Sequence, residues 1–268
     1  MNRQICFLAV VVLYFLTCVT AQATVQYAVT DLAGGGSPQE HYDINASGEV
    51  VCDAFNRAGH ALFYSASKMI DLGTLGGTNS YACGINDNGQ VVGYTINTGG
   101  TSHAWLYSSG MMTDLGTLGG TNSYAYSINA SGQVVGCYYT PNDASYHAFL
   151  YSGSTMTDLG ALGGTNSTNT IANAINASGQ VVGVSAGHAF LYSGSAMTDL
   201  NTLIDPLSGW TLKYAFAIND TGQIVGCGSN GGRPDVFLLT PVPEPSMLVL
   251  LCSALLGFGS MGLVRRRM

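Results

Sequence analysis

Residues 124–160 read YAYSINASGQVVGCYYTPNDASYHAFLYSGSTMTDLG, and this stretch decides the fold because near-copies of it recur along the chain. Three phrases mark the copies. An Asp-Leu pair stands at Asp31, Asp71, Asp114, Asp158 and Asp199, the Ile-Asn-x-x-Gly phrase begins at Ile44, Ile85, Ile128, Ile175 and Ile218, and His-Ala stands at His60, His103, His147 and His188, with residues 235–239 as a degenerate fifth copy. The Asp-Leu spacings of 40, 43, 44 and 41 residues indicate a repeat fold.

Each copy divides into four short apolar runs, which in the third copy cover residues 124–128, 133–139, 147–151 and 156–159. Turn residues separate them, as in Asn129-Ala130-Ser131-Gly132, and no run is long enough for a helix. Four strands with a period in the low forties are typical of a β-propeller blade. We therefore predict an all-β, five-bladed β-propeller over residues 24–241, with an open array or another closed β-structure as the alternative.

The fifth copy supplies only three strands, because residues 235–239 run into Thr240-Pro241 without a Met-Thr-Asp-Leu sequence. A spare copy of that strand lies at the other end of the body, in residues 27–32. Pairing the two would complete the last blade, close the ring and remove two exposed sheet edges. The N-terminal strand is therefore expected beside residues 235–239, with Asp31 facing Asp235.

The two ends of the chain read as sorting signals. Residues 1–23 combine Arg3, an apolar run and the stretch Ala21-Gln22-Ala23, which indicates a secretory signal peptide; a buried strand or an uncleaved membrane helix is the alternative. At the C-terminus, Val242, Pro243, Glu244 and Pro245 precede an apolar stretch, 246–264, and then Arg265, Arg266 and Arg267. The stretch can span a bilayer, and the arginines would stay cytoplasmic.

This tail, residues 242–268, resembles the PEP-CTERM sorting signal of Gram-negative and related bacteria. The resemblance implies recognition by an exosortase, a membrane protease thought to cut near the Pro-Glu-Pro sequence; a generic membrane anchor is the alternative. The body resembles the HAF-repeat family of probable extracellular bacterial proteins, named for the sequence found here at His147-Ala148-Phe149 and His188-Ala189-Phe190. That resemblance implies only a repeat architecture and an exported location, and it says nothing about an activity.

Charge limits the classes of partner. Residues 24–241 carry 14 acidic and 4 basic side chains. Because such a body repels phosphate, a nucleic-acid partner is not expected. The expected partners are the secretion machinery, the exosortase, the membrane through the C-terminal helix and, as a further candidate, polysaccharide.

Each repeated histidine precedes the repeated aspartate by 11 residues, which favours a structural His–Asp hydrogen bond in every blade over a shared metal site. The expected pairs are His60 with Asp71, His103 with Asp114, His147 with Asp158 and His188 with Asp199, each facing directly across a hairpin. No metal or other cofactor is expected.

Catalysis would need residues that break the repeat. Six carboxylates do so: Glu40, Asp43, Glu49, Asp53, Asp143 and Asp205. No motif surrounds them, so solvated surface charge is the preferred interpretation. Asn86–Gly89 and Asn219–Gly222 look faintly like Ca²⁺ loops, and Asn45-Ala46-Ser47 matches a glycosylation sequon, but turns explain all three. Cys52 with Cys83 is the one disulfide considered.

These observations predict an exported, non-catalytic protein with a structural or adhesive role at the cell surface or in the extracellular matrix. The alternative is a lectin-like propeller that binds sugars through the polar loops Gly76–Ser80, Gly119–Ser123 and Gly163–Ser167. A glycosidase is the weakest alternative.

Overall fold

The computed structural model describes residues 41–53, 59–141, 145–164 and 169–242. These ranges form five antiparallel sheets. The first sheet contains β1 (Tyr42–Ile44), β2 (Val50–Asp53), β3 (Ala61–Ser65) and β4 (Lys68–Asp71), and the second β5 (Asn79–Ile85), β6 (Val91–Ile96), β7 (Ser102–Ser108) and β8 (Met111–Gly116). The third contains β9 (Ser123–Ile128), β10 (Val134–Tyr139), β11 (Tyr146–Ser152) and β12 (Thr155–Asp158), the fourth β13 (Thr170–Ile175), β14 (Val181–Ser185), β15 (His188–Ser193) and β16 (Ala196–Asp199), and the fifth β17 (Trp210–Ile218), β18 (Ile224–Asn230) and β19 (Arg233–Leu239).

Each repeat is thus one sheet whose strands pair in chain order, as the four apolar runs predicted. The fifth sheet has three strands among the described residues, in keeping with its missing fourth run. One short helix was not expected: the 3₁₀ turn η1 (Leu200–Leu203) follows β16, and the Asp199 side chain caps it by accepting from the N–H of Asn201.

Glycines fix the strand spacing and the turns. Gly132 ends the β9–β10 turn with φ of +76°, a value that a residue with a Cβ rarely adopts. Gly136 lies within β10, where an added Cβ would stand 1.9 Å from the carbonyl oxygen of Tyr124. The repeated glycines therefore serve backbone geometry.

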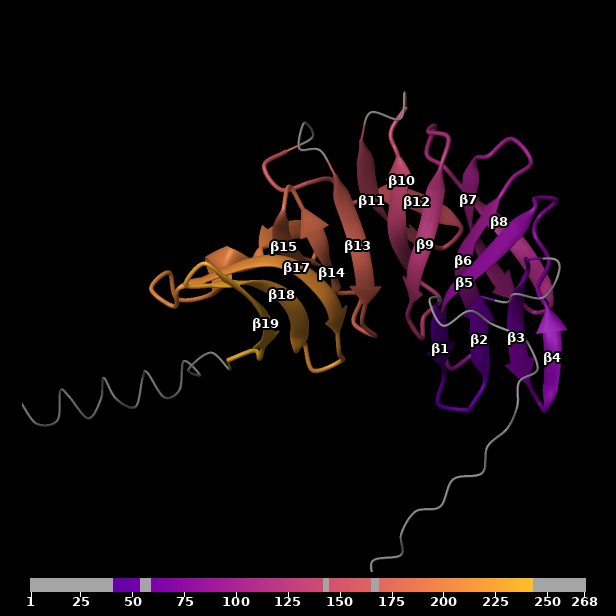
Figure 1. Cartoon of the computed structure of the whole chain (residues 1–268), viewed down its shortest axis with the longest axis horizontal. Coiled ribbons are helices and arrows are strands. Elements are labelled where there is room, and N and C mark those ends of the chain that lie inside the picture. The colour runs from indigo at the N-terminus through magenta and orange to yellow at the C-terminus, as the bar shows by residue number, and fades with distance from the viewer. Residues whose placement is uncertain (1–40, 54–58, 142–144, 165–168, 243–268) are drawn as a thin grey trace, which may run out of the picture. The chain divides into compact units, whose positions relative to one another are not determined.

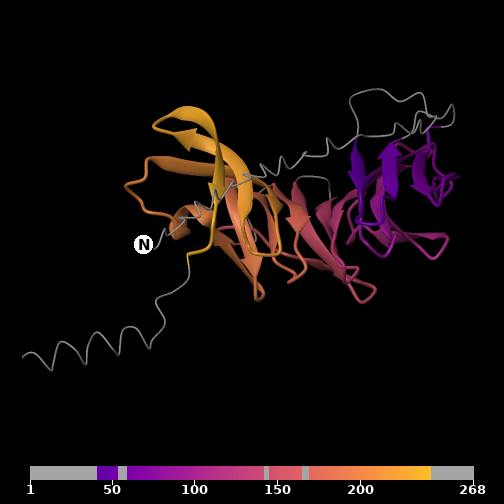
Figure 2. The same cartoon turned by 90° about the horizontal axis from the view of Figure 1, so that it is seen from below.

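The core lies between sheets that are consecutive in the chain. Val92 and Ala104 of the second sheet pack against Ala125, Val134 and Phe149 of the third, and three further clusters repeat the arrangement. The first strand of each sheet also lies beside the first strand of the next (Figures 1 and 2). Burial between successive sheets therefore holds the repeats together.

The two terminal sheets each keep one apolar face uncovered. Val225 of β18 is 39% exposed and Val236 of β19 is 67% exposed. The residues equivalent to Val225 in the other four sheets, Val51, Val92, Val135 and Val182, are all 0% exposed. On the first sheet Ile44 is 64% exposed, whereas its equivalents Ile85, Ile128 and Ile175 are buried. These surfaces are called the end faces below.

Several sequence predictions fall outside the described residues: the signal peptide 1–23, the strand 27–32 with Asp31, and most of the sorting signal, residues 243–268. Only Val242 of that signal is described, and it is exposed. Across the ranges that the structure describes, no helix has the length and apolar character needed to cross a bilayer.

Candidate functional site

The four His–Asp contacts are present, one on each of the first four sheets. The Nδ1 atom lies 2.9 Å from a carboxylate oxygen in His60–Asp71, 2.7 Å in His103–Asp114, 3.1 Å in His147–Asp158 and 2.6 Å in His188–Asp199. Each aspartate also accepts a main-chain N–H two residues further on, as from Gly116 to Asp114 at 2.8 Å. In three pairs this bond uses the oxygen that the histidine does not contact, whereas His60 lies near both oxygens of Asp71. Each pair therefore ties a hairpin to the loop that follows it.

The predicted register of these pairs is wrong, because the hairpin turn lies one residue further along the chain than the spacing suggested. Asp158 stands directly opposite Phe149, and His147 is its diagonal neighbour on the same face. The cause is the turn, because Gly153 and Ser154 both adopt positive φ and form a two-residue hairpin loop, placing Ser152 opposite Thr155. The hydrogen bond still forms, because a displacement of two residues along a strand leaves both side chains on the same face of the sheet.

Two of the pairs have additional partners that shift pKa values. The hydroxyl of Tyr138 donates to Asp158 at 3.0 Å, and burial, followed by the nearby carboxylate, raises the pKa of Tyr138 well above its ordinary value. Burial alone would raise the pKa of Asp199, but hydrogen bonds from His188 and Asn201 outweigh it and hold that pKa below its ordinary value. Both shifts reinforce the protonation states usual at neutral pH, a neutral Tyr138 and an ionised Asp199.

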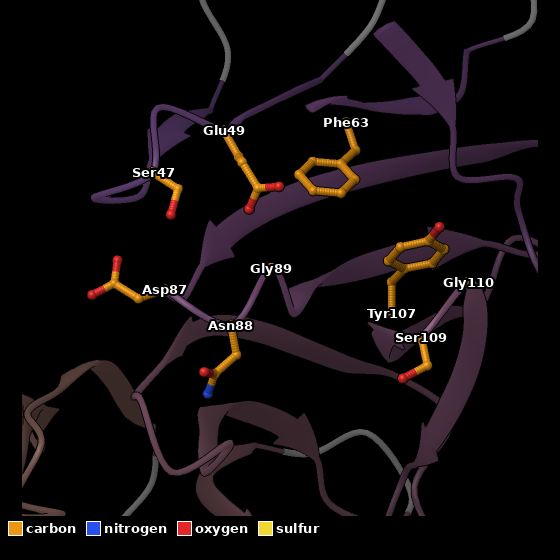
Figure 3. A pocket seen from close by; sticks show the side chains of 9 residues that line it. All are labelled: Ser47, Glu49, Phe63, Asp87, Asn88, Gly89, Tyr107, Ser109 and Gly110. Atoms are coloured by element: carbon orange, nitrogen blue, oxygen red, sulfur yellow. The ribbon is translucent and has the colours of Figure 1, made fainter. Parts of the chain in front are cut away.

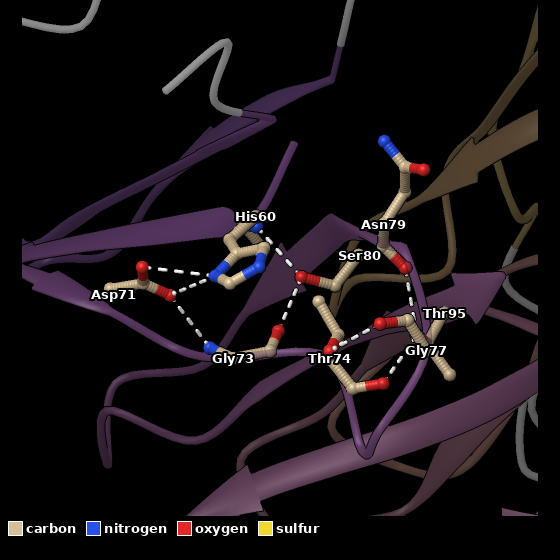
Figure 4. A network of polar contacts seen from close by, with 9 residues as sticks. His60, Asp71, Gly73, Thr74, Gly77, Asn79, Ser80 and Thr95 are labelled. Atoms are coloured by element: carbon tan, nitrogen blue, oxygen red, sulfur yellow. Dashed lines mark hydrogen bonds and ion pairs between the residues drawn. The ribbon is translucent and has the colours of Figure 1, made fainter. Parts of the chain in front are cut away.

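The polar loops connect one sheet to the next. The hydroxyl of Ser80 donates to the Gly73 carbonyl at 2.5 Å and accepts the N–H of Ala61 at 2.8 Å (Figure 4). Ser123 makes the same two bonds to Gly116 and Ala104 in the next repeat. The serine hydroxyls of the first two loops are thus occupied within the fold, which weakens their proposed role as a sugar-binding rim; residues 165–168 of the third loop lie outside the described residues.

An asparagine ladder also runs from sheet to sheet. The Nδ2 group of Asn129 donates to the Asn176 carbonyl at 3.0 Å, and its Oδ1 accepts the N–H groups of Ser131 and Gln133. The same side-chain to carbonyl bond links Asn45 to Asn86, Asn86 to Asn129, and Asn176 to Asn219. The first four of these asparagines are buried and Asn219, on the last sheet, is exposed.

The ladder explains two weak motifs. Asn45, Asn129 and Asn176 head sequons, yet their amides are buried and bonded. In the Ca²⁺-like loops the N–H of Gly89 donates to the Asn86 carbonyl, and Asp87 accepts the N–H of Ala46 on the preceding sheet. Both features are turns that bind neighbouring sheets, as the turn interpretation expected.

A cavity of about 440 Å³ lies between the first and second sheets and is lined by residues that deviate from the repeat. Its lining residues are Ser47, Glu49, Phe63, Asp87, Asn88, Gly89, Tyr107, Ser109 and Gly110. Figure 3 shows Glu49 and Phe63 entering from the first sheet, with Tyr107 on the second. The Phe63 and Tyr107 rings are 6.3 Å apart, edge to face.

Glu49 is the one repeat-breaking carboxylate among the six candidates that lines this cavity. Its Oε1 accepts the Ser65 hydroxyl at 2.5 Å and its Oε2 accepts the Asn45 amide at 2.7 Å. Asp43 instead accepts the N–H of Ile85, and Asp205 accepts the N–H of Leu207 in an exposed loop. Glu40, Asp143 and the side chain of Asp53 lie outside the described residues.

Sequence reasoning missed Phe63 and Asp87 as partners of Glu49. Aligning the copies would have found them, because Leu occupies the position of Phe63 in the other four repeats, and Ala replaces Asp87 in three of the four.

The described cysteines and possible metal ligands form neither a disulfide nor a metal site. Among the described residues, no disulfide joins Cys52 and Cys83, the pair that the sequence left open. Within the described residues, no three His, Cys, Asp or Glu side chains are grouped to hold a metal ion. The Nε1 of Trp105 is the buried side-chain polar atom that lacks a hydrogen-bond partner in those ranges.

Comparisons with known proteins bear on the fold. No protein-family model matches the chain, and no curated protein does. A protein assigned as TolB in Agrobacterium tumefaciens superposes with a TM-score of 0.53 at 13% identity, covering 75% of this chain and 76% of that one. TolB from Acinetobacter baumannii gives 0.45 at 12% identity, over 75% of this chain and 51% of that one. An extracellular domain from B. thetaiotaomicron gives 0.48 at 13%, over 80% and 28%.

The first of these likenesses, at 13% identity, shows the fold alone. Together with the five antiparallel sheets, it places the chain among all-β, β-propeller-like proteins.

Proposed function

We propose that this chain is an exported, non-catalytic repeat protein with a structural or adhesive role at the cell surface or in the extracellular matrix. One observation carries the proposal: the polar side chains that recur from repeat to repeat are hydrogen-bonded to other groups of the chain. The His–Asp pairs and the asparagine ladder leave the repeated residues as a scaffold. A scaffold of this kind acts through its surface.

Export and sorting are proposed from the two ends of the sequence. The signal peptide 1–23 would direct the chain out of the cytoplasm, and the helix 246–264 would hold the precursor in the inner membrane. Val242, Pro243, Glu244 and Pro245 would present the cleavage region to an exosortase, while Arg265, Arg266 and Arg267 would remain cytoplasmic. The mature body would then be released or displayed outside.

We also propose that the body closes into a five-bladed ring. The end faces support closure because they are the two halves of the interface that the chain uses four times: Val225 and Val236 on one side, and Ile44 on the other. The strand predicted at residues 27–32 would pair with β19 and supply the missing fourth strand. Closure would remove the exposed apolar surface and the free edge of β19.

Processing tests the proposed function. In a host that makes an exosortase, the mature protein should begin near Thr24, lack residues 246–264 and leave the inner membrane. Deleting Pro243-Glu244-Pro245 should keep it in the inner-membrane fraction at precursor mass. Fractionation with mass spectrometry makes the measurement, and the unaltered chain in the same host is the control. Unchanged release of the deletion variant would contradict exosortase processing.

A carbohydrate-binding propeller is the second candidate, favoured by the cavity that contains Glu49, Phe63 and Tyr107. Aromatic rings beside a carboxylate and hydroxyl groups are suited to sugars. A glycosidase remains the weakest candidate. It needs a pair of carboxylates flanking one bond, and although Glu49 and Asp87 both line the cavity, Asp87 accepts the N–H of Ala46 and Glu49 accepts from Ser65 and Asn45, so both carboxylates are engaged within the fold.

A further inference from the structure

The cavity between the first and second sheets differs in chemistry from the corresponding positions of the other repeats. Glu49 replaces a glutamine that occupies positions 90, 133, 180 and 223, and Phe63 replaces a leucine that occupies positions 106, 150, 191 and 238. The second of the two lining sheets adds Asp87, where positions 46, 130 and 177 hold alanine and position 220 also holds aspartate. Since the fold is built four times with glutamine and leucine, the changes at Glu49 and Phe63 are not needed for folding.

Glu49 reverses the local hydrogen bonding. In the second repeat the Gln90 amide approaches the Ser108 hydroxyl at 3.3 Å as a donor, whereas Glu49 accepts from Ser65. Each carboxylate oxygen of Glu49 accepts one described hydrogen bond and so keeps a second lone pair. No Lys or Arg in residues 41–53, 59–141, 145–164 and 169–242 forms an ion pair with Glu49 or Asp87. The cavity is therefore anionic.

An aromatic wall stands beside the anion. Phe63 is buried and the half-buried Tyr107 lies edge to face with it, so the Tyr107 ring offers the accessible aromatic surface. Ser47 adds a hydroxyl group from the first sheet (Figure 3). At about 440 Å³ the cavity falls within the range of small-molecule sites, about 300–1,000 Å³.

We propose that this cavity binds an amino sugar that carries a free ammonium group, presented by a polysaccharide. The ammonium would pair with the Glu49 carboxylate beside the aromatic rings, where cation–π attraction adds to the ion pair. The apolar face of the sugar ring would stack on Tyr107, and its hydroxyl groups would meet Ser47. The acidic body, with 14 acidic and 4 basic side chains over residues 24–241, would draw cationic chains toward it. The inference rests on the proposed surface location and names its partner class.

Isothermal titration of the full-length protein in a mild detergent tests the proposal. The probes are two β-1,4-linked tetramers, one of glucosamine and one of N-acetylglucosamine, which differ in charge and share a backbone. We expect the glucosamine tetramer to bind at least tenfold more tightly. Glu49→Gln should weaken its binding about tenfold or more and leave the acetylated tetramer unaffected. Phe63→Leu should weaken binding severalfold.

Asp205→Asn is the matched control, because it removes the same charge from an exposed loop outside the cavity. Its binding should stay within twofold of wild type. We expect Glu49→Gln to fold, because glutamine occupies the equivalent position in the other four repeats. Circular dichroism checks this.

Three results would overturn the proposal: no binding of the glucosamine tetramer by wild type, equal binding of both tetramers, or equal losses in Glu49→Gln and Asp205→Asn. Each can occur while the protein is still processed and exported, so a failed ligand is distinguishable from a failed proposed function.

Discussion

Replacing Asn129 by alanine tests whether the asparagine ladder holds the sheets together. The side chain is 4% exposed and makes four hydrogen bonds, with Nδ2 donating to Gln133 Oε1 and the Asn176 carbonyl, and Oδ1 accepting from the main chain of Ser131 and Gln133. Ser131 is exposed, so water replaces one of the four. The other three bonds, one buried and two part-buried, contribute about 1 kcal/mol each, which gives a loss of about 3 kcal/mol in the free energy of unfolding.

Urea unfolding followed by tryptophan fluorescence measures this loss, since Trp105 is fully buried. Ser131→Ala is the control within the same turn and should change stability by less than about 0.5 kcal/mol. A loss below about 1 kcal/mol in Asn129→Ala would show that the ladder bonds are as weak as surface contacts, and the reasoning would fail.

The same unfolding measurement on Asn219→Ala tests whether the ring closes. In the described fold its amide is exposed and donates to Gln223 alone. A closed ring would bury it and supply the Asn45 carbonyl as the next acceptor, so we expect Asn219→Ala to cost about 3 kcal/mol, as Asn129→Ala does. A cost of about 1 kcal/mol or less would refute closure and leave the rest of the ladder intact. Protein concentration is varied as a check, because a loss that depends on concentration would mean that the end faces join two copies head to tail.

Two further predictions concern single side chains. Trp105→Phe should change the free energy of unfolding by less than about 1 kcal/mol, because removing the unpartnered Nε1 offsets the lost volume and phenylalanine holds the equivalent positions 149, 190 and 237. Phe149→Ala, by contrast, should cost about 3–5 kcal/mol. Urea unfolding of both variants checks this, and a large loss in Trp105→Phe would contradict it. The pKa of Asp199 is lowered in the folded state, so its ionised form stabilises the fold above the unfolded pKa near 3.9 and that stability is lost as pH falls through the folded value. The advantage of wild type over Asp199→Asn should therefore be full above about pH 5 and shrink on acidification, and an advantage independent of pH down to about pH 2 would contradict the assignment.

Sequence periodicity was sufficient for the strands because each apolar run is bounded by residues with a turn mechanism. The observed third sheet agrees with the predicted runs to within a residue at nearly every end. The hairpin register failed for a local reason. Spacing alone does not say which residues take positive φ. Gly153 and Ser154 do so, and the two-residue turn is therefore displaced by one residue from the Ser152-Gly153 that the sequence favoured.

Contacts between repeats were harder to predict than those within them. Asn129 is visibly repeated, yet its bond to a carbonyl 47 residues away depends on how two sheets pack. The role of Ser80 has the same origin, since its partner Ala61 belongs to the preceding repeat. For the cavity, the deviation at Glu49 was visible in the sequence, but its meeting with Tyr107 across a sheet interface was not.

The distinction between repeated and deviating residues also orders the functional argument. A polar residue that recurs from copy to copy must be compatible with several interfaces, and His147, Asn129 and Ser123 each bond backbone or side-chain partners there. A residue that deviates in one copy is free of that requirement, because the equivalent residues of the other copies show that the fold forms without it. Glu49 and Phe63 deviate in the same copy and line the same cavity. Two independent departures from a working pattern that meet in one place are better explained by a ligand than by the fold, which is why the search for a partner of this protein begins between the first and second sheets.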